Sequence, residues 1–464
     1  MNRYGLPRWL DDRLRGSHFL HRALNKVFPD HWSFMLGEIA MYSFAILVAT
    51  GIFLTFFYSP SVNEVVYRGP YEPLRGVEMS EAYASVLRLS FEVRAGLVMR
   101  QIHHWTALVF LAAIVAHLCR VFFTGAFRRP REINWIIGVT LLLLAIYNGF
   151  SGYSLPDDLL SGTGLRIAYS IAESVPFVGT WTAFLAFGGE FPAHDILRRL
   201  MITHVLIVPA VLAGLLGLHL AIVWRQKHTQ FPGPGKTSTN VVGSRLWPTY
   251  TAKSVGLLFG LVAVFGLMGG LLQINPVWLY GPYDPATVAS PAQPDWYLGW
   301  LEGALRLFPP WEIRIFGHVI ANPFFPAVLL PGLTFLVLYT WPWIERRITR
   351  DRAEHHLLQR PRDNPMRTGL GVAALTFYAL LFLAGSNDII ADLFAFPVNA
   401  VTWVMRIAVL ALPVVAGFLA YRFMWGLKRT DAGSFLEVPL RELVARTGSR
   451  SPDGPARRQE PAER

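Results

Sequence analysis

Two apolar stretches of the chain each carry a pair of histidines. The first, residues 100–120 (RQIHHWTALVFLAAIVAHLCR), contains His103 and His117, which are fourteen residues apart. Fourteen residues are close to four helical turns, so both imidazoles leave one face of a helix at depths roughly 21 Å apart. Because ionisable groups at membrane depth are costly and usually functional, this stretch predicts a partner helix with histidines at the same two depths.

Residues 200–224 (LMITHVLIVPAVLAGLLGLHLAIVW) provide that partner, with His204 and His219 fifteen residues apart. Two such helices can form two bis-histidine sites, one stacked above the other. Imidazole suits iron, and haem iron accepts two axial ligands. A single buried histidine is more often a satisfied packing residue, but four of them paired at matching depths predict two haems.

Two points about the histidine spacing remain open: which of two adjacent histidines is the ligand, and how the second helix accommodates its longer spacing. His104 competes with His103 as a ligand, but it points about 100° away on the helix, and the fourteen-residue register with His117 favours His103. The fifteen-residue spacing of the second stretch adds about 100° of rotation. We therefore expect a local adjustment of that helix near Pro209.

The composition is that of a membrane protein. The 464 residues are 53% hydrophobic and only 16% charged, and the mean hydropathy is +0.37. Apolar stretches of about 20 residues, each long enough to span a bilayer, predict an all-α, polytopic fold. We expect eight transmembrane helices, at about 33–58, 101–122, 133–153, 200–224, 252–273, 324–343, 369–386 and 398–424.

The net charge of +11 follows the predicted topology rather than a nucleic-acid surface. With the N-terminus inside, the predicted cytoplasmic segments hold 30 Lys and Arg, against 10 in the predicted outer segments. Under the positive-inside rule this bias places both termini in the cytoplasm. We therefore predict a multi-pass plasma-membrane protein that contacts lipid and binds no nucleic acid.

Two further features concern how haem would be held. The chain has a single cysteine, Cys119, and no CxxCH motif, so any haem is bound without a covalent link. Glycines repeat the histidine register, with fourteen residues between the two members of each pair. Glycine allows a bulky planar ligand to approach the backbone, although packing of helices through small residues is an alternative. The predicted cofactor-binding glycines are Gly37, Gly51, Gly138 and Gly152.

Several motifs in order resemble cytochrome b of the quinol-oxidising cytochrome bc complexes. They are the RxxH…H stretch, the second two-histidine stretch, the paired glycines, GYSLP at 152–156, PDWY at 294–297 and ALR at 304–306. PDWY is similar to the PEWY signature of that family. The resemblance covers about residues 30–425. SLPDDLLSGTGLR and PDWYLGWLEGALRLFPPWEI resemble the actinobacterial members in particular.

This resemblance implies a respiratory quinol:cytochrome c reductase that works by a Q cycle. Quinol would be oxidised at the outer face. One electron would pass to a Rieske iron–sulfur subunit and on to a c-type cytochrome subunit. The other would cross two b-type haems to a quinone at the cytoplasmic face. The actinobacterial likeness implies menaquinol and menaquinone, a homodimeric complex and a possible supercomplex with a terminal oxidase.

Loop charge and spacing assign the depths of the predicted ligands. His103 and His204 share the outer haem, and His117 and His219 share the inner one. Arg100 and Arg199 lie just outside the outer pair and are predicted to bind haem propionates, with snorkelling at the membrane interface as the alternative.

PDWY lies in an outer loop, where the family oxidises quinol. Asp295 is the only acid in the motif and is predicted to accept a proton from quinol, with Tyr297 assisting. The alternative for Asp295 is an N-cap of a helix at Trp296–Leu307. Pro294 and Trp296 are predicted to contact quinone.

The predicted inner site is less defined. His228 and Lys253 are candidate quinone-binding residues, because Ser254 occupies the position where mitochondrial members carry an acid. Contact of such basic residues with lipid headgroups is the alternative. His355 and His356 are adjacent in a charged segment and are not predicted to bind metal.

The predicted organisation has four parts. An amphipathic surface helix at 8–28 occupies the segment 1–31. A dihaem four-helix bundle follows at 32–230, and a flanking half with four more transmembrane helices and the PDWY loop covers 231–430. A cytoplasmic tail, disordered at its end, covers 431–464. Rival functions are a dihaem membrane anchor of another quinone-linked oxidoreductase and a haem-free proton-coupled transporter.

Overall fold

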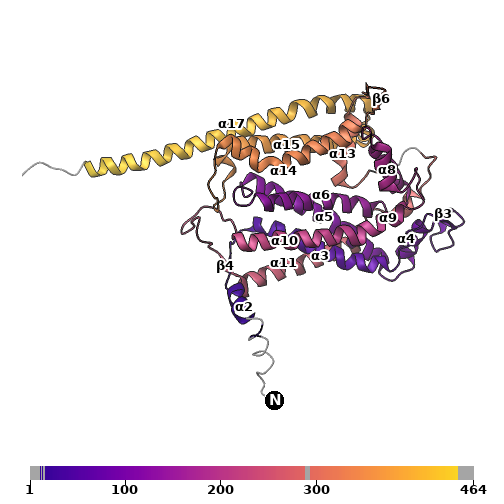
Figure 1. Cartoon of the computed structure of the whole chain (residues 1–464), viewed down its shortest axis with the longest axis horizontal. Coiled ribbons are helices and arrows are strands. Elements are labelled where there is room, and N and C mark those ends of the chain that lie inside the picture. The colour runs from indigo at the N-terminus through magenta and orange to yellow at the C-terminus, as the bar shows by residue number, and fades with distance from the viewer. Residues whose placement is uncertain (1–10, 12, 14–15, 288–292, 448–464) are drawn as a thin grey trace, which may run out of the picture.

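The computed structural model describes residues 11–447 apart from 12, 14–15 and 288–292. Within these residues, eight helical segments are long and apolar enough to cross a membrane, which confirms the predicted all-α polytopic fold. They run side by side in one elongated bundle (Figure 1). Their principal helices are α3 (Met35–Thr55), α5 (Gly96–Phe123), α6 (Glu132–Tyr153), α10 (Val208–Gln226), α11 (Thr251–Leu271), α14 (Leu330–Thr349), α15 (Pro365–Ala384) and α17 (Val398–Thr447).

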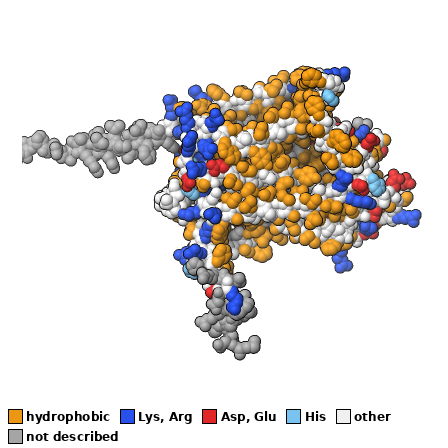
Figure 2. Space-filling view, in the orientation of Figure 1, with side chains coloured by type: hydrophobic (Ala, Val, Ile, Leu, Met, Phe, Trp, Pro, Cys, Tyr) orange, Lys and Arg blue, Asp and Glu red, His pale blue; other side chains and the backbone are white. Residues whose placement is uncertain are grey.

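The middle of the molecule is apolar on its outside, and charged side chains gather at its two ends (Figure 2). On α17, for example, Leu410 and Val414 are 75% and 69% exposed. Each square ångström of such surface costs about 25 cal/mol in water and nothing comparable in hydrocarbon. The chain is therefore an integral membrane protein.

Helices α3, α5, α6 and α10 form a four-helix bundle. In it α3 packs against α5, α5 against α6, and α6 against α10. Helix α11 packs on α5 and α3, whereas α14 packs against α6 and α15 packs against α17. The last three spanning helices thus lie together on one side of the bundle, and α11 lies on the other (Figure 1).

One end of the bundle, which we call the N-terminal face, carries short elements beside the start of the chain (left in Figure 1). They are α2 (Gly16–Leu24), the strand pair β1 (Val27–Phe28) and β4 (Ser244–Arg245), and the turns η1 (Trp32–Phe34) and η6 (Pro361–Asp363). The pairing of β1 with β4 ties the segment before α3 to the segment before α11.

The opposite end, which we call the loop face, carries longer connections. Its helices are α4 (Glu81–Phe91), α7 (Leu159–Glu173), α8 (Gly179–Phe187), α12 (Val277–Tyr280), α13 (Trp296–Leu307) and α16 (Asn387–Leu393). Its strands form two hairpins, β2 (Glu64–Val66) with β3 (Glu78–Ser80) and β5 (Ile313–Ile315) with β6 (His318–Ile320), and the turn η2 (Glu72–Leu74) lies within the first.

The local predictions differ from the structure in several places. In the predicted surface helix 8–28, the described residues 11, 13 and 16–24 are helical and Val27–Phe28 forms β1, whereas residues 1–10 lie outside the described residues. For the outer loop 154–199, the sequence also predicts short surface helices at 165–173 and 194–199. The first is the second half of α7, which starts earlier because Asp158 and Ser161 form a reciprocal capping box. The helix predicted at 194–199 is wrong: Ile196–Ile202 (α9) is the beginning of the fourth spanning segment. Helix α8 was not predicted.

The final helix is also longer than predicted. Helix α17 continues beyond residue 424, the predicted end of the last span, and runs through Thr447. The predicted tail at 431–464 therefore begins as helix. Its expected disorder falls on residues 448–464, which lie outside the described residues.

Three spanning segments contain a wide π turn next to a proline. These turns are η3 (Thr203–Ile207) before Pro209, η4 (Leu246–Tyr250), which contains Pro248, and η5 (Phe325–Leu329), which contains Pro326. Proline has no N–H to donate, and its ring clashes with the carbonyl four residues earlier. This clash arises at Pro209, which lies inside a continuous span, and η3 relieves it by lengthening the hydrogen-bonded loop by one residue. Pro248 and Pro326 lie in the first turn of their spans, where proline is tolerated.

Close packing of α13 on α15 depends on Gly303. A Cβ built on Gly303 would lie 1.7 Å from the carbonyl oxygen of Leu381, a backbone atom that cannot move alone. We expect Gly303→Ala to cost about 1–3 kcal/mol or more of stability, because α13 must shift away from α15. The measurement is the apparent Tm in detergent by circular dichroism. Gly332→Ala is the matched control, since nothing lies within 4 Å of that position. Equal Tm values for the two variants would contradict this account of the packing.

Candidate functional site: two histidine pairs in the four-helix bundle

The structure brings the four predicted histidines together in two pairs. The ring centroids of His103 and His204 are 6.3 Å apart, and those of His117 and His219 are 6.5 Å apart. The two rings are inclined at 70° in both pairs. Two metal–imidazole bonds of about 2 Å on opposite sides of one metal place the ring centroids roughly 6 Å apart. Both pairs therefore have the separation at which two imidazoles could bind one metal between them.

The fifteen-residue spacing of the second helix is absorbed by the π turn η3. This turn contains His204, and the N–H of Val208 closes it by donating to the carbonyl of Thr203, five residues earlier. A π turn accommodates one extra residue without changing the direction of the helix. The predicted adjustment near Pro209 is thus confirmed, and it explains why both pairs keep the same ring separation.

Hydrogen bonds fix the tautomer of the outer pair. Nδ1 of His204 lies 2.9 Å from the carbonyl oxygen of Asn148, which can only accept, so Nδ1 carries the proton. The Thr50 hydroxyl donates to the carbonyl of Ile46 and lies 2.9 Å from Nδ1 of His103, so it accepts the proton of that nitrogen. Both rings are left with an unprotonated Nε2, the form that binds a metal.

Each of the four predicted glycines faces one of the four histidines. A Cβ built on Gly37, Gly51, Gly138 or Gly152 would approach His117, His103, His219 or His204, respectively. The closest distances are 3.3, 3.3, 3.7 and 2.3 Å in that order. The glycines therefore leave room for the imidazoles themselves, in addition to the predicted room for a planar ligand.

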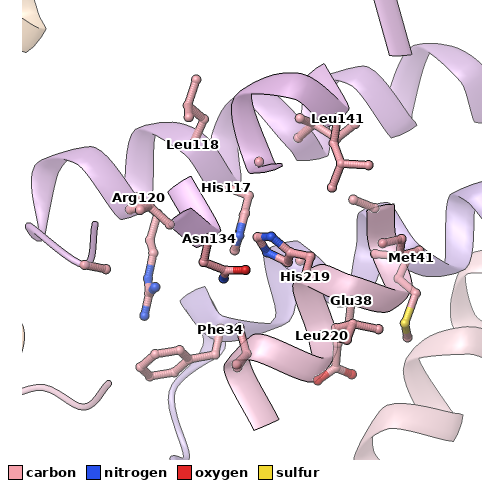
Figure 3. Close-up of a pocket in the computed structure, with 18 of the residues that line it drawn as sticks. Phe34, Glu38, Met41, His117, Leu118, Arg120, Asn134, Leu141, His219 and Leu220 are labelled. Carbon is pink, nitrogen blue, oxygen red and sulfur yellow. The ribbon is translucent and has the colours of Figure 1, made fainter. Parts of the chain in front are cut away.

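Each histidine pair lines a largely apolar cavity. The outer cavity, of about 240 Å³, includes Gly51 and Gly152, and the inner cavity, of about 370 Å³, includes Gly37 and Gly138. In the inner cavity, His117 and His219 point toward each other (Figure 3). No group of three or more His, Cys, Asp and Glu among the described residues could hold a metal ion. Two ligands per site suit a metal whose other ligands come from a macrocycle, so the residues fit haem.

The outer cavity contains a hydrogen-bonded acid. Oδ1 of Asp295 lies 2.9 Å from Nε2 of His104, and Oδ2 accepts a hydrogen bond of 3.2 Å from the Tyr297 hydroxyl. Burial and the Asp295 carboxylate raise the pKa of Tyr297, so its phenol remains protonated. Asp295 does occupy the N-cap position of α13, which has the predicted bounds Trp296–Leu307, but its carboxylate makes no capping hydrogen bond to this helix. The sequence considered His104 only as a rival ligand to His103, and its contact with Asp295 was not predicted.

The two arginines predicted to bind haem propionates differ in position. Arg100 is buried and lines the outer cavity, where one of its nitrogens donates to the carbonyl of Asn275 and Nε has no hydrogen-bond partner. Arg199 does not line the cavity, and its guanidinium donates to the carbonyl of Leu185 on α8. Only Arg100 is placed to meet an anion beside the histidines.

An inner counterpart of Arg100 was missed. Arg120 lines the inner cavity with its guanidinium 4.2 Å from the centre of the Phe34 ring, and its Nε and Nη2 are buried without hydrogen-bond partners (Figure 3). The signal was present in the sequence. Arg100 precedes His103 by three residues, and Arg120 follows His117 by three residues, so each arginine lies one turn beyond its histidine.

The candidate residues for quinone binding are only partly brought together. His228 lines the inner cavity, and burial with the nearby charges of Lys26, Arg131 and Arg120 lowers its pKa to about 4. Lys253 does not line the inner cavity, and its ammonium forms an exposed ion pair of 2.7 Å with Asp30.

The two candidates that flank Asp295 in the sequence do not reach the cavities of the histidine pairs. Pro294 and Trp296 line neither of the two cavities. Trp296 instead packs beside Tyr297 in a hydrophobic cluster with Leu111 and Leu142. Of the PDWY residues, only Asp295 and Tyr297 reach the outer cavity.

Comparison with known proteins agrees with this geometry. Residues 108–282 match the family described as cytochrome b(N-terminal)/b6/petB. The cytochrome bc1 complex cytochrome b subunit of Mycobacterium leprae is 55% identical over 423 residues, covering 91% of this chain and 77% of that protein. The chain belongs to the cytochrome b family. Membership of this family implies that the chain binds haem b.

Other relatives support the same membership. The cytochrome bc1 complex cytochrome b subunit of Streptomyces coelicolor is 51% identical, over 92% of this chain and 78% of that protein. A solved chain titled "Hyperthermophilic respiratory Complex III" shares the fold, with a TM-score of 0.66 and 21% identity, and the match covers 89% of this chain and 99% of that one.

The glycine contacts generate a graded prediction for this cytochrome b. Gly152→Ala places a methyl group 2.3 Å from the His204 ring, whereas Gly138→Ala places one 3.7 Å from the His219 ring, an ordinary contact. We expect Gly152→Ala to lose most of the haem at the outer pair, because the ring cannot keep its position. Gly138→Ala should retain haem and serves as the matched control. The measurement is haem per polypeptide in purified membranes, and equal haem loss in both variants would refute the clearance role.

Proposed function

We propose that this chain is the cytochrome b subunit of a quinol:cytochrome c oxidoreductase, which oxidises quinol near the loop face and reduces quinone near the N-terminal face. One observation carries the proposal. The same four-helix bundle holds two histidine pairs at two depths, and each pair opens into a cavity with protonatable side chains. A redox reaction that moves electrons across a membrane and exchanges protons at both ends needs this arrangement.

The cofactors in this proposal are two non-covalent b haems. His103 and His204 would hold the outer one, and His117 and His219 the inner one. When bound, the haems supply one-electron carriers at the two depths. The protein positions them, and Arg100 and Arg120 offer unpaired guanidinium nitrogens to their propionates.

At the outer cavity, Asp295 would accept a proton from quinol. General-base action requires a carboxylate within reach of the proton, and Asp295 lines this cavity. The hydrogen bonds from His104 and Tyr297 hold the carboxylate in place. Because the Tyr297 phenol stays protonated, it would act as a donor toward a quinone oxygen.

The orientation in the membrane follows from charge. Lys and Arg gather at the N-terminal face, whereas the loop face carries both signs (Figure 2). The positive-inside rule then makes the N-terminal face cytoplasmic, with both termini on that side. Quinol oxidation at the loop face releases protons outside, and quinone reduction at the N-terminal face takes protons up inside, so the cycle translocates charge.

The proposed partners are separate chains. Cys119 is the only cysteine, so a Rieske iron–sulfur centre and a covalently bound c-type haem must be carried by other subunits. The bacterial relatives are named as subunits of a cytochrome bc1 complex. We extend this to menaquinol as substrate, a homodimeric complex and direct association with a terminal oxidase.

The ligand assignment is tested by His204→Ala. We expect the loss of one haem of two and of quinol oxidation, because the outer pair loses a ligand. The measurements are haem quantification and the reduced-minus-oxidised spectrum of the purified complex. His194→Ala, an exposed histidine on the loop face, is the control. Retention of two haems would contradict the assignment, and a wild-type spectrum without b-type absorbance would favour a haem-free transporter.

The role of Asp295 is tested by Asp295→Asn, which keeps the shape of the side chain but cannot accept a proton. We expect an inhibitor-sensitive quinol:cytochrome c assay to show a fall of about 100-fold in rate, with haem content unchanged. Asp392→Asn, which changes an exposed acid of α16, is the matched control. An unaffected rate in Asp295→Asn would remove this residue from the proton path.

A further inference from the structure

The inner cavity contains one carboxylate to which the function above gives no role. Among the described residues that line this cavity, Glu38 is the only acid. It lies in the first turn of α3, next to Gly37, and is half-buried. Figure 3 places Glu38 on the same side of the cavity as Leu220, beyond the two facing histidines.

Two hydroxyl groups donate hydrogen bonds to the Glu38 carboxylate, and a third hydroxyl lies next to one of them. The Tyr250 hydroxyl donates a short hydrogen bond to Oε1, and the Ser254 hydroxyl donates one of 2.5 Å to Oε2. The Ser254 oxygen also lies 2.7 Å from the hydroxyl of Tyr42. Glu38 and Tyr42 come from α3, Tyr250 from η4 and Ser254 from α11, so the cluster forms only where the first and fifth spans meet.

Hydroxyl groups, and no positively charged side chain, hold the Glu38 carboxylate in this cluster. No Lys or Arg in the described part of the chain lies within ion-pair distance of Glu38, although Arg120, Arg131 and Lys227 line the same cavity. The titratable groups that line the cavity near it are Tyr250, His228 and these three cations. No cation is therefore paired with this carboxylate, and its direct hydrogen-bond partners are hydroxyl groups.

We propose that Glu38 delivers a proton to a quinone bound in the inner cavity. The inference rests on the function proposed above, in which two quinols oxidised at the loop face each supply one electron to the same quinone. Reduction to quinol then needs two protons. The O–H bond of the Glu38 carboxyl breaks, a new O–H bond forms on a quinone carbonyl oxygen, and the carboxylate is reprotonated from the cytoplasm through the hydroxyl cluster. The second proton comes from water.

The other candidates are placed less well for this step. Lys253 is engaged with Asp30 at the exposed surface, outside the cavity. His228 lines the cavity, but its ring packs at a tilt of 47° against Phe28 with centroids 4.5 Å apart. Phe28 also stacks on Tyr250, so His228 helps to shape the wall that holds the hydroxyl cluster.

The test isolates the inner cavity by working in the Asp295→Asn background of the complete complex. Because Asp295→Asn slows the outer route about 100-fold, a short-chain menaquinol then reduces the bound haem chiefly from the N-terminal face, with Glu38 accepting the proton in this reverse direction. Stopped-flow absorbance measures the rate as a function of pH. We expect Glu38→Gln to lower the rate by about 100-fold and to flatten its pH dependence, while haem content and spectrum stay unchanged. Glu38→Asp retains a carboxyl group, so its rate should be at least about tenfold higher than that of Glu38→Gln.

Two controls separate the possible outcomes. Lys253→Ala and Glu354→Gln change exposed groups near the same face and should leave the rate unchanged. Equal rates in Glu38→Gln and its parent would overturn the inference while leaving the proposed function intact.

If the parent itself shows no reduction from this face, the proposed function fails. If Glu38→Gln does not assemble, Tyr250→Phe combined with Ser254→Ala removes the relay but keeps the acid. An unchanged pH profile in that variant would equally refute the proposal.

Discussion

The dihistidine sites depend on keeping two pairs of imidazoles opposite each other inside a hydrocarbon-embedded bundle. Two imidazoles that share one metal have ring centroids roughly 6 Å apart, and the separations of 6.3 and 6.5 Å satisfy this requirement. In the outer pair, neither ring can turn away without leaving its Nδ1 unpaired in an apolar cavity. The Thr50 hydroxyl and the Asn148 carbonyl are therefore part of the same constraint, since they bind the outer nitrogens of the rings.

The rest of the bundle adapts to this constraint. One extra residue between His204 and His219 would rotate one ring out of register, and the π turn η3 removes that rotation. Glycine stands opposite every ring. The most crowded imidazole is that of His204, where the packed helices leave no room for a Cβ. The membrane makes both solutions necessary, since water cannot enter to satisfy a displaced ring.

The two cavities share an architecture but differ in chemistry. At the loop face, the acid Asp295 is bound by an imidazole and a phenol. At the N-terminal face, the acid Glu38 is bound by a phenol and a serine hydroxyl, and basic side chains line the same space. An acid at each end of an otherwise apolar bundle gives protons defined exits and entries, which suits opposite half-reactions on the two sides of a membrane.

The sequence by itself determined the class and the spans of this protein, and it predicted the two histidine pairs that the structure brings together. Hydropathy and histidine period are local properties, because a helix fixes which residues share a face before any partner is present. The same reasoning identified the glycines and placed Asp295 and Tyr297 in one outer motif. It could not tell that Arg199 turns toward α8 or that Lys253 pairs with Asp30, since both contacts join segments that no spacing relates.

Only the tertiary structure decided which polar groups meet inside the cavities. Glu38 lies more than two hundred residues from Tyr250 and Ser254, and nothing in either segment marks them as partners. Likewise, His104 gained a partner only when α13 packed against the bundle and carried Asp295 to it. Periodicity predicts the face of a helix, but the pairing of faces depends on packing of the whole chain.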